Sequence, residues 1–405
     1  MSRYGLLGRR LTHSYSPQLH ALLGNPDYTL FPVEPEALAD FFSAGEFDGI
    51  NVTIPYKRDA LRFCASLSPQ ARAVGAVNTV VRRPDGTLYG DNTDIDGFTA
   101  LLALAGGVCP GEKALVLGSG GASQTVRYVL SGAGAEVVTI SRSGADHYGN
   151  IERHADAVLL VNATPVGMYP QTAAQPLCLT RLPRLRAVID LIYNPLRTRL
   201  LQQAQALGMR AVGGLAMLVA QGAAAHERFG FGTVDAARQA GILRRLRGQM
   251  ENLLLIGMPG SGKTTVGRLL AERLNREFYD CDEVFSAQFG SSAADYLARF
   301  GEADFRLHET RVLAGLSYRS GCVIATGGGC VTRRENDALL RENSRVLWLQ
   351  RDLSRLASDG RPLSLRDGAE ALWLQRRARY AALADDTVGN NGALSQTIET
   401  ILEIL

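Results

Sequence analysis

Residues 251–270, ENLLLIGMPGSGKTTVGRLL, constrain the fold more than any other part of the chain. The run GMPGSGKT (257–264) matches the pattern Gly-x-x-x-x-Gly-Lys-[Ser/Thr] at every fixed position. An apolar, strand-like run precedes it and a helical pattern follows it, which is the context of a phosphate-binding loop. The backbone N–H groups of such a loop and the following helix N-terminus hold phosphates. The segment therefore predicts a nucleotide-binding α/β domain that begins near residue 251.

Lysine is scarce, because only Lys57, Lys113 and Lys263 are lysines among 43 basic residues. Lys263 is the lysine of the phosphate loop, where it would reach the terminal phosphates, and Thr264 would coordinate Mg²⁺. Lys57 follows the turn-like run NVTIPYK (51–57). Arginine cannot lose its proton in a protein, whereas burial and neighbours can tune an ammonium, so Lys57 is a candidate for proton transfer. Lys113 precedes a predicted strand and is expected at the surface. The loop residues expected to contact the nucleotide are Gly260, Ser261, Gly262, Lys263, Thr264 and Thr265.

Bulk composition is that of an ordinary multidomain enzyme, with 405 residues, 46% hydrophobic and 20% charged. A formal charge of +3 with scattered arginines argues against nucleic acid or anionic membrane as partners. The first residues form no signal peptide, and the apolar runs are too short to span a bilayer. Six cysteines lack CxxC or Cys/His spacing, so we expect reduced, buried thiols, no zinc site and a cytoplasmic protein.

Apolar runs alternate with amphipathic stretches through most of the chain, which favours α/β layers. Strands are expected at ALVL (114–117), EVVTI (136–140), AVLLV (157–161) and AVIDL (187–191), and helices at 214–230 and just after it. A new buried strand at 251–257 opens into the phosphate loop. The main domain boundary is therefore expected near residues 247–251.

Further polar motifs follow the phosphate loop in a fixed order. Asp280 and Asp282 are two residues apart, so on a strand both would point toward the phosphates. The later motifs are FGEADFRLHE (300–309), ATGGGCV (325–331), DGRPLS (359–364) and RRARYAALAD (376–385). With these motifs in this order, residues 251–405 resemble shikimate kinase over their whole length.

That resemblance implies a role for each motif. Asp280 would help to hold Mg²⁺, and Asp282 would orient or deprotonate the accepting hydroxyl. Arg361 would stabilise the transferred phosphoryl group from a lid, and Arg355 would stack on adenine. The substrate would be bound through its carboxylate and by close backbone approach, at Arg306, Arg376 or its neighbour Arg377, and Gly327, Gly328 and Gly329.

The run GSGGAS (118–123) after a predicted strand is similar to a dinucleotide-binding fingerprint. An NAD site would offer an acidic residue about 20 residues further on, whereas this chain offers Arg142. An arginine there suits a 2′-phosphate, so NADP(H) is the expected cofactor, although the family that the motifs described next resemble often has a second arginine where this chain has Asp146. The expected contacts are Gly118, Ser119, Gly120, Gly121, Ala122, Ser123 and Arg142.

Residues 1–100 hold small polar motifs that suit a pocket for a polyhydroxylated acid. These are HSYSP (13–17), NVTIPYK (51–57), GAVNT (75–79) and GDNTD (90–94), each expected at the end of a strand. Each alone would also be an ordinary turn. Together with NATPVGMYP (162–170) and GLAMLVAQ (214–221), they make residues 1–248 resemble shikimate dehydrogenase.

This second resemblance implies Lys57 and Asp94 as a catalytic pair, in which the ammonium supplies a proton to the ketone oxygen. The substrate carboxylate would be bound by Ser14 and Ser16. The ring hydroxyls would be bound by Asn51, Thr53, Asn78 and Gln221, with Tyr193 nearby.

The two resemblances imply one bifunctional α/β enzyme of the shikimate pathway. The expected domains are a substrate lobe (1–100 with about 225–248), a Rossmann-like NADP lobe (101–224) and a P-loop kinase domain of the nucleoside-monophosphate-kinase type (251–405). Its partners would be 3-dehydroshikimate and shikimate, with a monomer or homodimer left open. Alternatives are an NAD-dependent quinate/shikimate dehydrogenase, a half that only binds or regulates, and a kinase for another small alcohol such as gluconate.

Overall fold

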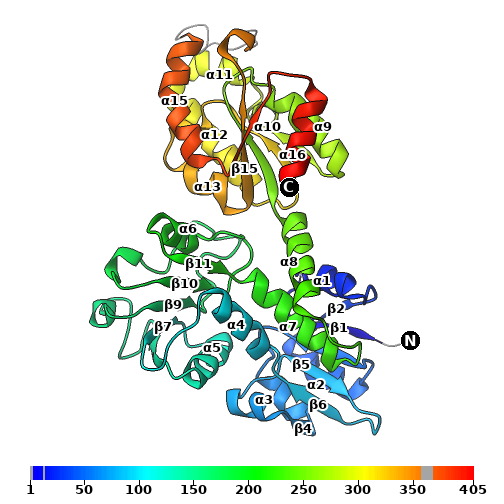
Figure 1. Cartoon of the computed structure of the whole chain (residues 1–405). Coiled ribbons are helices and arrows are strands. Elements are labelled where there is room, and N and C mark those ends of the chain that lie inside the picture. Colours follow the sequence, from blue (N-terminus) through cyan, green and yellow to red (C-terminus); the bar gives the residue numbers. More distant parts are fainter. Residues whose placement is uncertain (1–2, 12–13, 357–367) are drawn as a thin grey trace. The chain divides into compact units, whose positions relative to one another are not determined.

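The apolar runs and amphipathic stretches of the sequence form three β-sheets with helices packed around them (Figure 1). The computed structural model describes residues 3–11, 14–356 and 368–405. The chain divides into two compact units, Met1–Arg247 and Gly248–Leu405. The first unit contains two sheets and the second contains one. The α/β class expected from the sequence is confirmed.

The first sheet is mixed, and its strand order is β2-β1-β3-β5-β6-β4. Strand β5 runs antiparallel to both of its neighbours, β3 and β6. The start of β5 therefore lies beside the carboxyl ends of β3 and β6. The strands are β1 (Tyr4–Gly8), β2 (Thr29–Pro32), β3 (Gly49–Val52), β4 (Ser66–Leu67), β5 (Thr79–Arg82) and β6 (Leu88–Asp91).

The second sheet, of order β11-β10-β9-β7-β8, is parallel throughout. Both of its faces are buried, because Leu115 and Leu117 belong to one core and Ala114 and Val116 to another. This explains why its strands are continuous apolar runs. The strands are β7 (Lys113–Leu117), β8 (Glu136–Ile140), β9 (Leu159–Asn162), β10 (Ala187–Asp190) and β11 (Arg210–Gly213).

The sheet of the second unit, of order β13-β14-β12-β15-β16, is also parallel and covered on both faces. Along β12, Leu254 and Ile256 join one core while Leu253 and Leu255 join the other. The phosphate loop follows β12 directly. The strands are β12 (Asn252–Ile256), β13 (Phe278–Asp280), β14 (Val323–Ala325), β15 (Ser344–Gln350) and β16 (Asp386–Gly389).

Helices connect and cover these strands. In the first unit the α-helices are α1 (Ser16–Leu23), α2 (Leu38–Ala44), α3 (Pro69–Val74), α4 (Asp94–Leu104), α5 (Gly121–Gly132), α6 (Arg199–Ala206) and α7 (Leu215–Arg228), and α8 spans Ala236–Met250. Those of the second unit are α9 (Lys263–Leu274), α10 (Cys281–Phe289), α11 (Ala293–Phe300), α12 (Glu302–Ser317), α13 (Asn336–Glu342), α15 (Ala369–Leu383) and α16 (Leu394–Ile404). Short 3-10 turns are η1 (Pro35–Ala37), η2 (Asp59–Phe63), η3 (Ile151–His154), η4 (Leu179–Arg181), η5 (Cys330–Thr332) and η6 (Leu353–Arg355).

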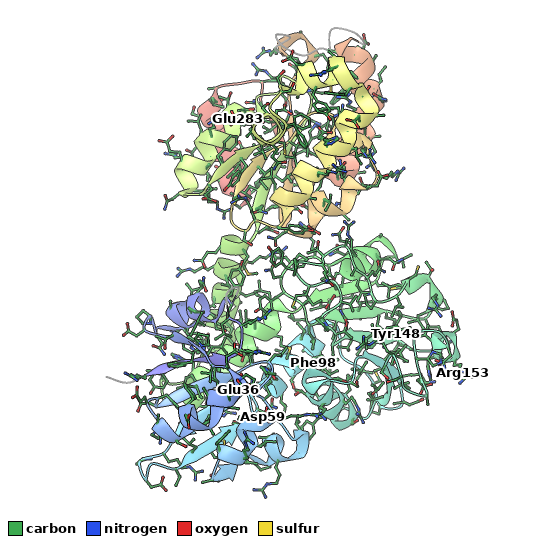
Figure 2. All side chains as sticks on the ribbon, turned by 180° about the vertical axis from the view of Figure 1, so that it is seen from behind. Glu36, Asp59, Phe98, Tyr148, Arg153 and Glu283 are labelled. Atoms are coloured by element: carbon green, nitrogen blue, oxygen red, sulfur yellow. The ribbon has the colours of Figure 1, made fainter. Side chains whose placement is uncertain are left out.

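Helices α4 and α7 pack closely within the first unit (Figure 1). A Cβ added to Gly97 of α4 would lie 2.9 Å from the backbone oxygen of Met217 and 3.0 Å from Cβ of Gln221, both on α7. Phe98, the next residue of α4, is fully buried and lies inside the unit (Figure 2). The close contact fixes the first turn of α4, which carries Asp94, relative to α7.

The cysteines differ partly from expectation. Cys281, Cys322 and Cys330 are buried thiols, but Cys109 and Cys178 are exposed. Both exposed residues lie in loop segments outside the strands, where the sheet cores do not reach. Within the described ranges, no helix combines the length and the apolar character needed to cross a membrane.

Candidate active sites

In the first unit, three neighbouring strands bring the polar motifs together. Asn51 at the end of β3 pairs in register with Thr79 at the start of β5, and Thr79 pairs with Asp91 at the end of β6. The motif GAVNT therefore precedes a strand, and the expectation that each motif ends a strand is wrong for it. Because β5 is antiparallel, its beginning supplies the same edge of the sheet as the ends of β3 and β6.

Lys57 and Asp94 lie at this edge and face each other. The Lys57 ammonium nitrogen lies 2.6 Å from Asp94 Oδ2, and the two side chains are 23% and 9% exposed. Asp94 stands in the first turn of α4, where the positive end of the helix dipole favours a carboxylate. The two residues that the sequence assigns to catalysis thus form a partly buried ion pair.

Asn78 orients this pair. Its amide Nδ2 donates to Asp94 Oδ1 at 2.9 Å, while its Oδ1 accepts from the Thr93 backbone N–H at 2.7 Å. The N–H of Thr93 fixes which end of the amide is oxygen, because a backbone N–H can only donate. The NH₂ group of Asn78 must therefore face Asp94. Asn78 was predicted as a substrate ligand, and in the structure its side chain holds the Asp94 carboxylate.

The remaining predicted substrate residues lie on loops and elements around the pair. Ser14 and Ser16 are bonded to each other, with 3.2 Å between their hydroxyl oxygens. Tyr15, between them, meets the edge of the Tyr193 ring with centroids 6.3 Å apart, which brings the loop after β10 to the loop after β1. Buried Asn51 accepts from the Tyr28 hydroxyl at 2.8 Å. Thr53 follows β3, and Gln221 lies on α7 opposite Gly97 of α4.

The predicted dinucleotide loop lies between β7 and α5, at the carboxyl edge of the second sheet. Gly118 has a φ of +102°, and a Cβ there would lie 2.9 Å from Thr164 Cγ2 in the loop after β9. Space is open beside Gly120 and Gly121, whereas Ser123, in place of a third glycine, is buried. A parallel sheet binds dinucleotides at this kind of edge, where chain order reverses across β7.

Arg142 is exposed just beyond β8, so it is accessible to a phosphate at this edge. Asp146 follows it but is engaged elsewhere, because its Oδ1 lies 2.9 Å from His154 Nε2. The residues fit a bound NADP(H): a glycine loop with open space, a helix N-terminus and a guanidinium in place of an acidic residue.

A buried carboxylate at the same edge was not among the predicted site residues. Asp190, at the end of β10, is fully buried, and burial raises its pKa to about 7. It accepts hydrogen bonds from Thr198 Oγ1 at 2.7 Å, Asn162 Nδ2 at 3.0 Å and the Ile192 N–H at 3.1 Å. The bonds hold the loop that carries Tyr193. The signal in the sequence was an aspartate that ends an apolar strand, AVID.

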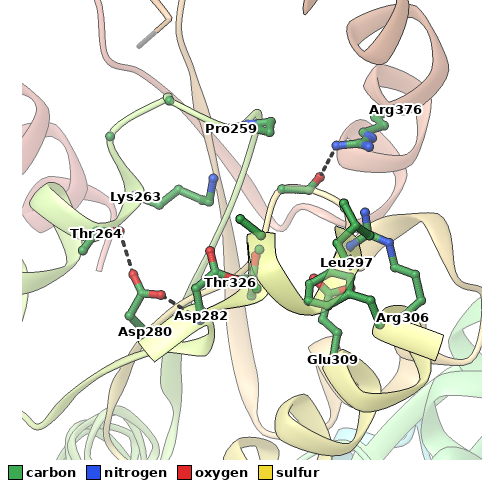
Figure 3. A pocket seen from close by; sticks show the side chains of 18 of the residues that line it. Pro259, Lys263, Thr264, Asp280, Asp282, Leu297, Arg306, Glu309, Thr326 and Arg376 are labelled. Atoms are coloured by element: carbon green, nitrogen blue, oxygen red, sulfur yellow. Dashed lines mark hydrogen bonds and ion pairs between the residues drawn. The ribbon is translucent and has the colours of Figure 1, made fainter. Parts of the chain in front are cut away.

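In the second unit, the phosphate loop opens onto a cavity of about 350 Å³ (Figure 3). Its wall combines predicted nucleotide ligands with predicted acceptor ligands. The lining residues are Pro259, Gly260, Gly262, Lys263, Thr264, Thr265, Asp280, Asp282, Ala293, Ala294, Leu297, Phe305, Arg306, Glu309, Thr326, Gly327, Gly328, Gly329, Arg351 and Arg376. Ser261, a loop residue predicted to contact the nucleotide, is buried and does not line the cavity. Arg355 also lies outside the lining, and its side chain donates to the Asn391 carbonyl.

Lys263 and Thr264 begin α9, immediately after the loop. Nζ of Lys263 donates to the carbonyls of Gly257 and Met258 at 3.0 and 2.9 Å. Thr264 Oγ1 donates to Asp280 Oδ2 at 2.6 Å (Figure 3). A hydroxyl and a carboxylate oxygen side by side are hard ligands of the type that Mg²⁺ prefers, with phosphate oxygens completing the shell.

Asp280 and Asp282 do not share a strand, and this prediction was wrong. Strand β13 ends at Asp280, which caps α10: its Oδ1 accepts from the Asp282 N–H at 2.9 Å. Asp282 lies in the first turn of that helix and still reaches the cavity. Removal of water by surrounding protein, together with the nearby carboxylates of Asp280 and Glu309, raises the pKa of Asp282 to about 6.

The glycine turn 327–329 contacts several parts of the cavity wall at close range. A Cβ on Gly327 would lie 2.4 Å from Glu309 Oε1, and one on Gly328 would lie 2.6 Å from Pro259 Cδ. A Cβ on Gly329 would collide with the Arg306 guanidinium at 2.0 Å. A larger residue at Gly328 would push the turn away from the phosphate loop, whereas at Gly327 or Gly329 the Glu309 or Arg306 side chain would have to move.

Two predicted arginines line the cavity, and neighbouring groups hold both of them. Arg306 pairs with Glu309 at 2.7 Å, and buried Arg376 donates to the Gly328 carbonyl at 3.2 Å (Figure 3). The adjacent Arg377 is exposed, so the geometry favours Arg376 as the ligand. Glu309 was missed, although its spacing of three residues from Arg306 on a helix could have indicated the pair. Arg361 lies outside the described residues.

Two different family models match separate parts of the chain. A family model described as the shikimate dehydrogenase substrate binding domain matches residues 6–80, and one described as shikimate kinase matches residues 259–405. The shikimate dehydrogenase (NADP(+)) of Clostridium perfringens strain SM101 is 33% identical over 269 residues, a match that covers 61% of this chain and 99% of that protein.

Two solved structures are similar to the first unit. One is a chorismate mutase/shikimate 5-dehydrogenase fusion protein from Clostridium acetobutylicum, with a TM-score of 0.57, 33% identity and coverage of 61% of this chain and 97% of that one. The other is shikimate 5-dehydrogenase from Thermus thermophilus in complex with NADP(H) and shikimate, with a TM-score of 0.55, 36% identity and coverage of 61% and 100%.

Proposed function

The chain belongs to the shikimate dehydrogenase family and carries a shikimate kinase domain, and from this we propose roles for the main candidate site residues. It is a bifunctional enzyme of the shikimate pathway. The first unit reduces 3-dehydroshikimate to shikimate with NADPH, and the second phosphorylates shikimate with Mg·ATP. The observation that carries the first assignment is the 2.6 Å contact between Lys57 and Asp94 beside a cluster of amides and hydroxyls.

In the dehydrogenase, NADPH supplies the hydride to the ring carbon, and Lys57 delivers a proton to the ketone oxygen. Asp94 holds the ammonium in place, and Asn78 holds Asp94. Ser14 and Ser16 bind the carboxylate of the substrate. Gly118, the start of α5 and Arg142 would hold the cofactor, with the Arg142 guanidinium suited to its 2′-phosphate. Asn51, Thr53, Gln221 and Tyr193 contact the hydroxyls and face of the ring.

In the kinase, Mg·ATP supplies the phosphoryl group, and the chain positions both reactants. Lys263 moves from the loop carbonyls to the terminal phosphates, and Thr264 with Asp280 binds the metal. Asp282 accepts the proton of the attacking hydroxyl, for which a pKa of about 6 leaves it ionised at neutral pH. Arg306 and Arg376 bind the carboxylate of shikimate, and Arg361 stabilises charge on the phosphoryl group.

One incubation tests both activities and their order. The purified chain is given 3-dehydroshikimate, NADPH and Mg·ATP, and the products are identified by mass. The expected end product is shikimate 3-phosphate. Accumulation of shikimate would refute the kinase assignment alone, whereas unchanged 3-dehydroshikimate would refute the assignment of Lys57.

A further inference from the structure

One face of α15 holds the glycine turn of the kinase cavity through its carbonyl groups. Arg376, Arg379 and Tyr380 stand three and four residues apart, so their side chains share one face of the helix. The Arg376 and Tyr380 side chains both donate to the Gly328 carbonyl, and Arg379 Nε donates to the Val331 carbonyl at 2.9 Å. The acceptor-binding turn is thus anchored to this helix.

Tyr380 is not part of the cavity wall, since it is fully buried behind it. Its ring stacks on Trp348, with centroids 5.8 Å apart and planes inclined by 26°. Its hydroxyl also lies 4.0 Å from the sulfur of Met258, the residue that follows Gly257 at the start of the phosphate loop. Packing therefore fixes the position of this hydroxyl, and the hydroxyl reaches both loops that form the site.

The Gly328–Gly329 peptide needs such an anchor. Without a Cβ, glycine adopts many backbone conformations at little cost, so a glycine-rich turn can rotate its peptide planes easily. In a trans peptide the C=O and the following N–H point in opposite directions. A hydrogen bond from Tyr380 to the Gly328 carbonyl therefore directs the Gly329 N–H away from α15. Gly328 and Gly329 both line the cavity, so the orientation of this peptide determines how the Gly329 N–H is presented to an acceptor there.

The orientation of the Gly328–Gly329 peptide affects the phosphate loop, because Gly328 packs directly against that loop. Gly328 packs so closely on Pro259 that an added Cβ would lie 2.6 Å from Pro259 Cδ and 2.8 Å from its backbone nitrogen. The turn that receives the acceptor and the loop that receives the phosphates are therefore in direct contact. A rotation of the Gly328 peptide would change the distance between the acceptor and the phosphoryl group.

We propose that Tyr380 is a positioning residue of the kinase, which locks the Gly328–Gly329 peptide so that its N–H faces the acceptor. The proposal rests on the proposed kinase function of this cavity. Tyr380 is buried and does not line the cavity, so it is not placed to contact substrate or nucleotide. It acts through the turn, on the acceptor side of the site.

Tyr380→Phe tests the proposal because it keeps the ring and its stacking on Trp348 and removes only the hydroxyl. The KM for shikimate in ADP formation is expected to rise roughly threefold to tenfold, the effect of one lost hydrogen bond, while the KM for Mg·ATP stays unchanged. Oxidation of shikimate with NADP⁺ by the same preparation measures the amount of chain with a folded first unit. Tyr279→Phe is the matched control, since its hydroxyl bonds to Glu277 at 2.7 Å, away from the turn.

A KM for shikimate equal to that of the wild type and of Tyr279→Phe would overturn the proposal, even if the melting temperature fell. An equal rise in both KM values would also overturn it, because the effect would not be specific to the acceptor. Failure of the wild-type chain to phosphorylate shikimate would instead refute the kinase function, and it is detected before any variant is compared.

Discussion

Two substitutions of Lys57, which contacts Asp94, test the need for a positive charge separately from the need for proton transfer. Lys57→Arg keeps a positive charge beside Asp94 but cannot release a proton, and Lys57→Ala removes both. We expect both variants to lower kcat for shikimate oxidation by about 10²-fold to 10⁴-fold, with a smaller loss of substrate binding in the arginine variant. Kinase activity of the same samples serves as the control. A Lys57→Arg enzyme with the wild-type rate would contradict proton transfer by Lys57.

The raised pKa of Asp190 makes the folded chain less stable as the pH rises from about 4 to 7. Its pKa is about 7 in the folded chain and near 3.8 when exposed, so between these values the folded state holds a proton that the unfolded state releases. Its contribution to the free energy of unfolding is full below pH 4 and is lost as the pH rises through 7. An asparagine at this position would not titrate, yet its side chain can still accept from Ile192 and Asn162.

Asp190→Asn should therefore gain stability relative to the wild type as the pH rises from 5.5 to 7, by roughly 2 kcal/mol. Melting curves of both proteins at several pH values measure this difference, in which the other titrating groups cancel. A difference that stays constant across this range would show that Asp190 is already ionised at pH 5.5.

At the scale of elements, the sequence predicted strands well where both faces of a sheet are covered. The apolar runs at 114–117 and 252–256 form strands because each of their sides joins a core. The prediction failed at Asp280, where a strand passes directly into a helix. Asp280 caps a helix, and a helix cap and a strand residue look alike in the run YDCDE. The run RPDGT (83–87) between β5 and β6 is a local signal of their antiparallel hairpin, whereas the antiparallel pairing of β5 with β3 involves strands that are distant in sequence.

Because α4 packs closely on α7, one added methyl group at Gly97 should lower the dehydrogenase activity. Gly97→Ala should force the helices apart, because its Cβ would lie 2.9 Å from the Met217 carbonyl oxygen. The displacement would move Asp94 at one end of the contact and Gln221 at the other. We expect a loss of dehydrogenase activity of about tenfold or more, with kinase activity retained.

Gly241→Ala is the matched control within the same unit. It also lies inside a helix, but an added Cβ there meets no atom within 4 Å. Alanine should stabilise that helix by about 0.5–1 kcal/mol and leave dehydrogenase activity unchanged. Equal effects of the two substitutions would show that the α4–α7 contact is not what Gly97 protects.

At the scale of the whole molecule, each unit has cores of its own and would bind its own nucleotide. We therefore expect two steps in thermal unfolding. NADP⁺ at a hundred times its Kd should stabilise one step by about 2.7 kcal/mol, and Mg·ADP at the same excess should stabilise the other. Calorimetry with each ligand alone measures both shifts. A single transition that both ligands move would show that the units unfold together.

Because the chain has so few lysines, reagents that modify amines should label it at few sites. Two of the three lysines lie in the proposed sites, and ion pairs hold the third, Lys113, whose side chain is 15% exposed. A reagent that acylates most proteins over their whole surface would find few lysine targets here. Modification of Lys57 or Lys263, followed by peptide mass, would instead report which of the two sites a ligand protects. An unselective reagent thus becomes a site-selective occupancy probe for each half of the enzyme.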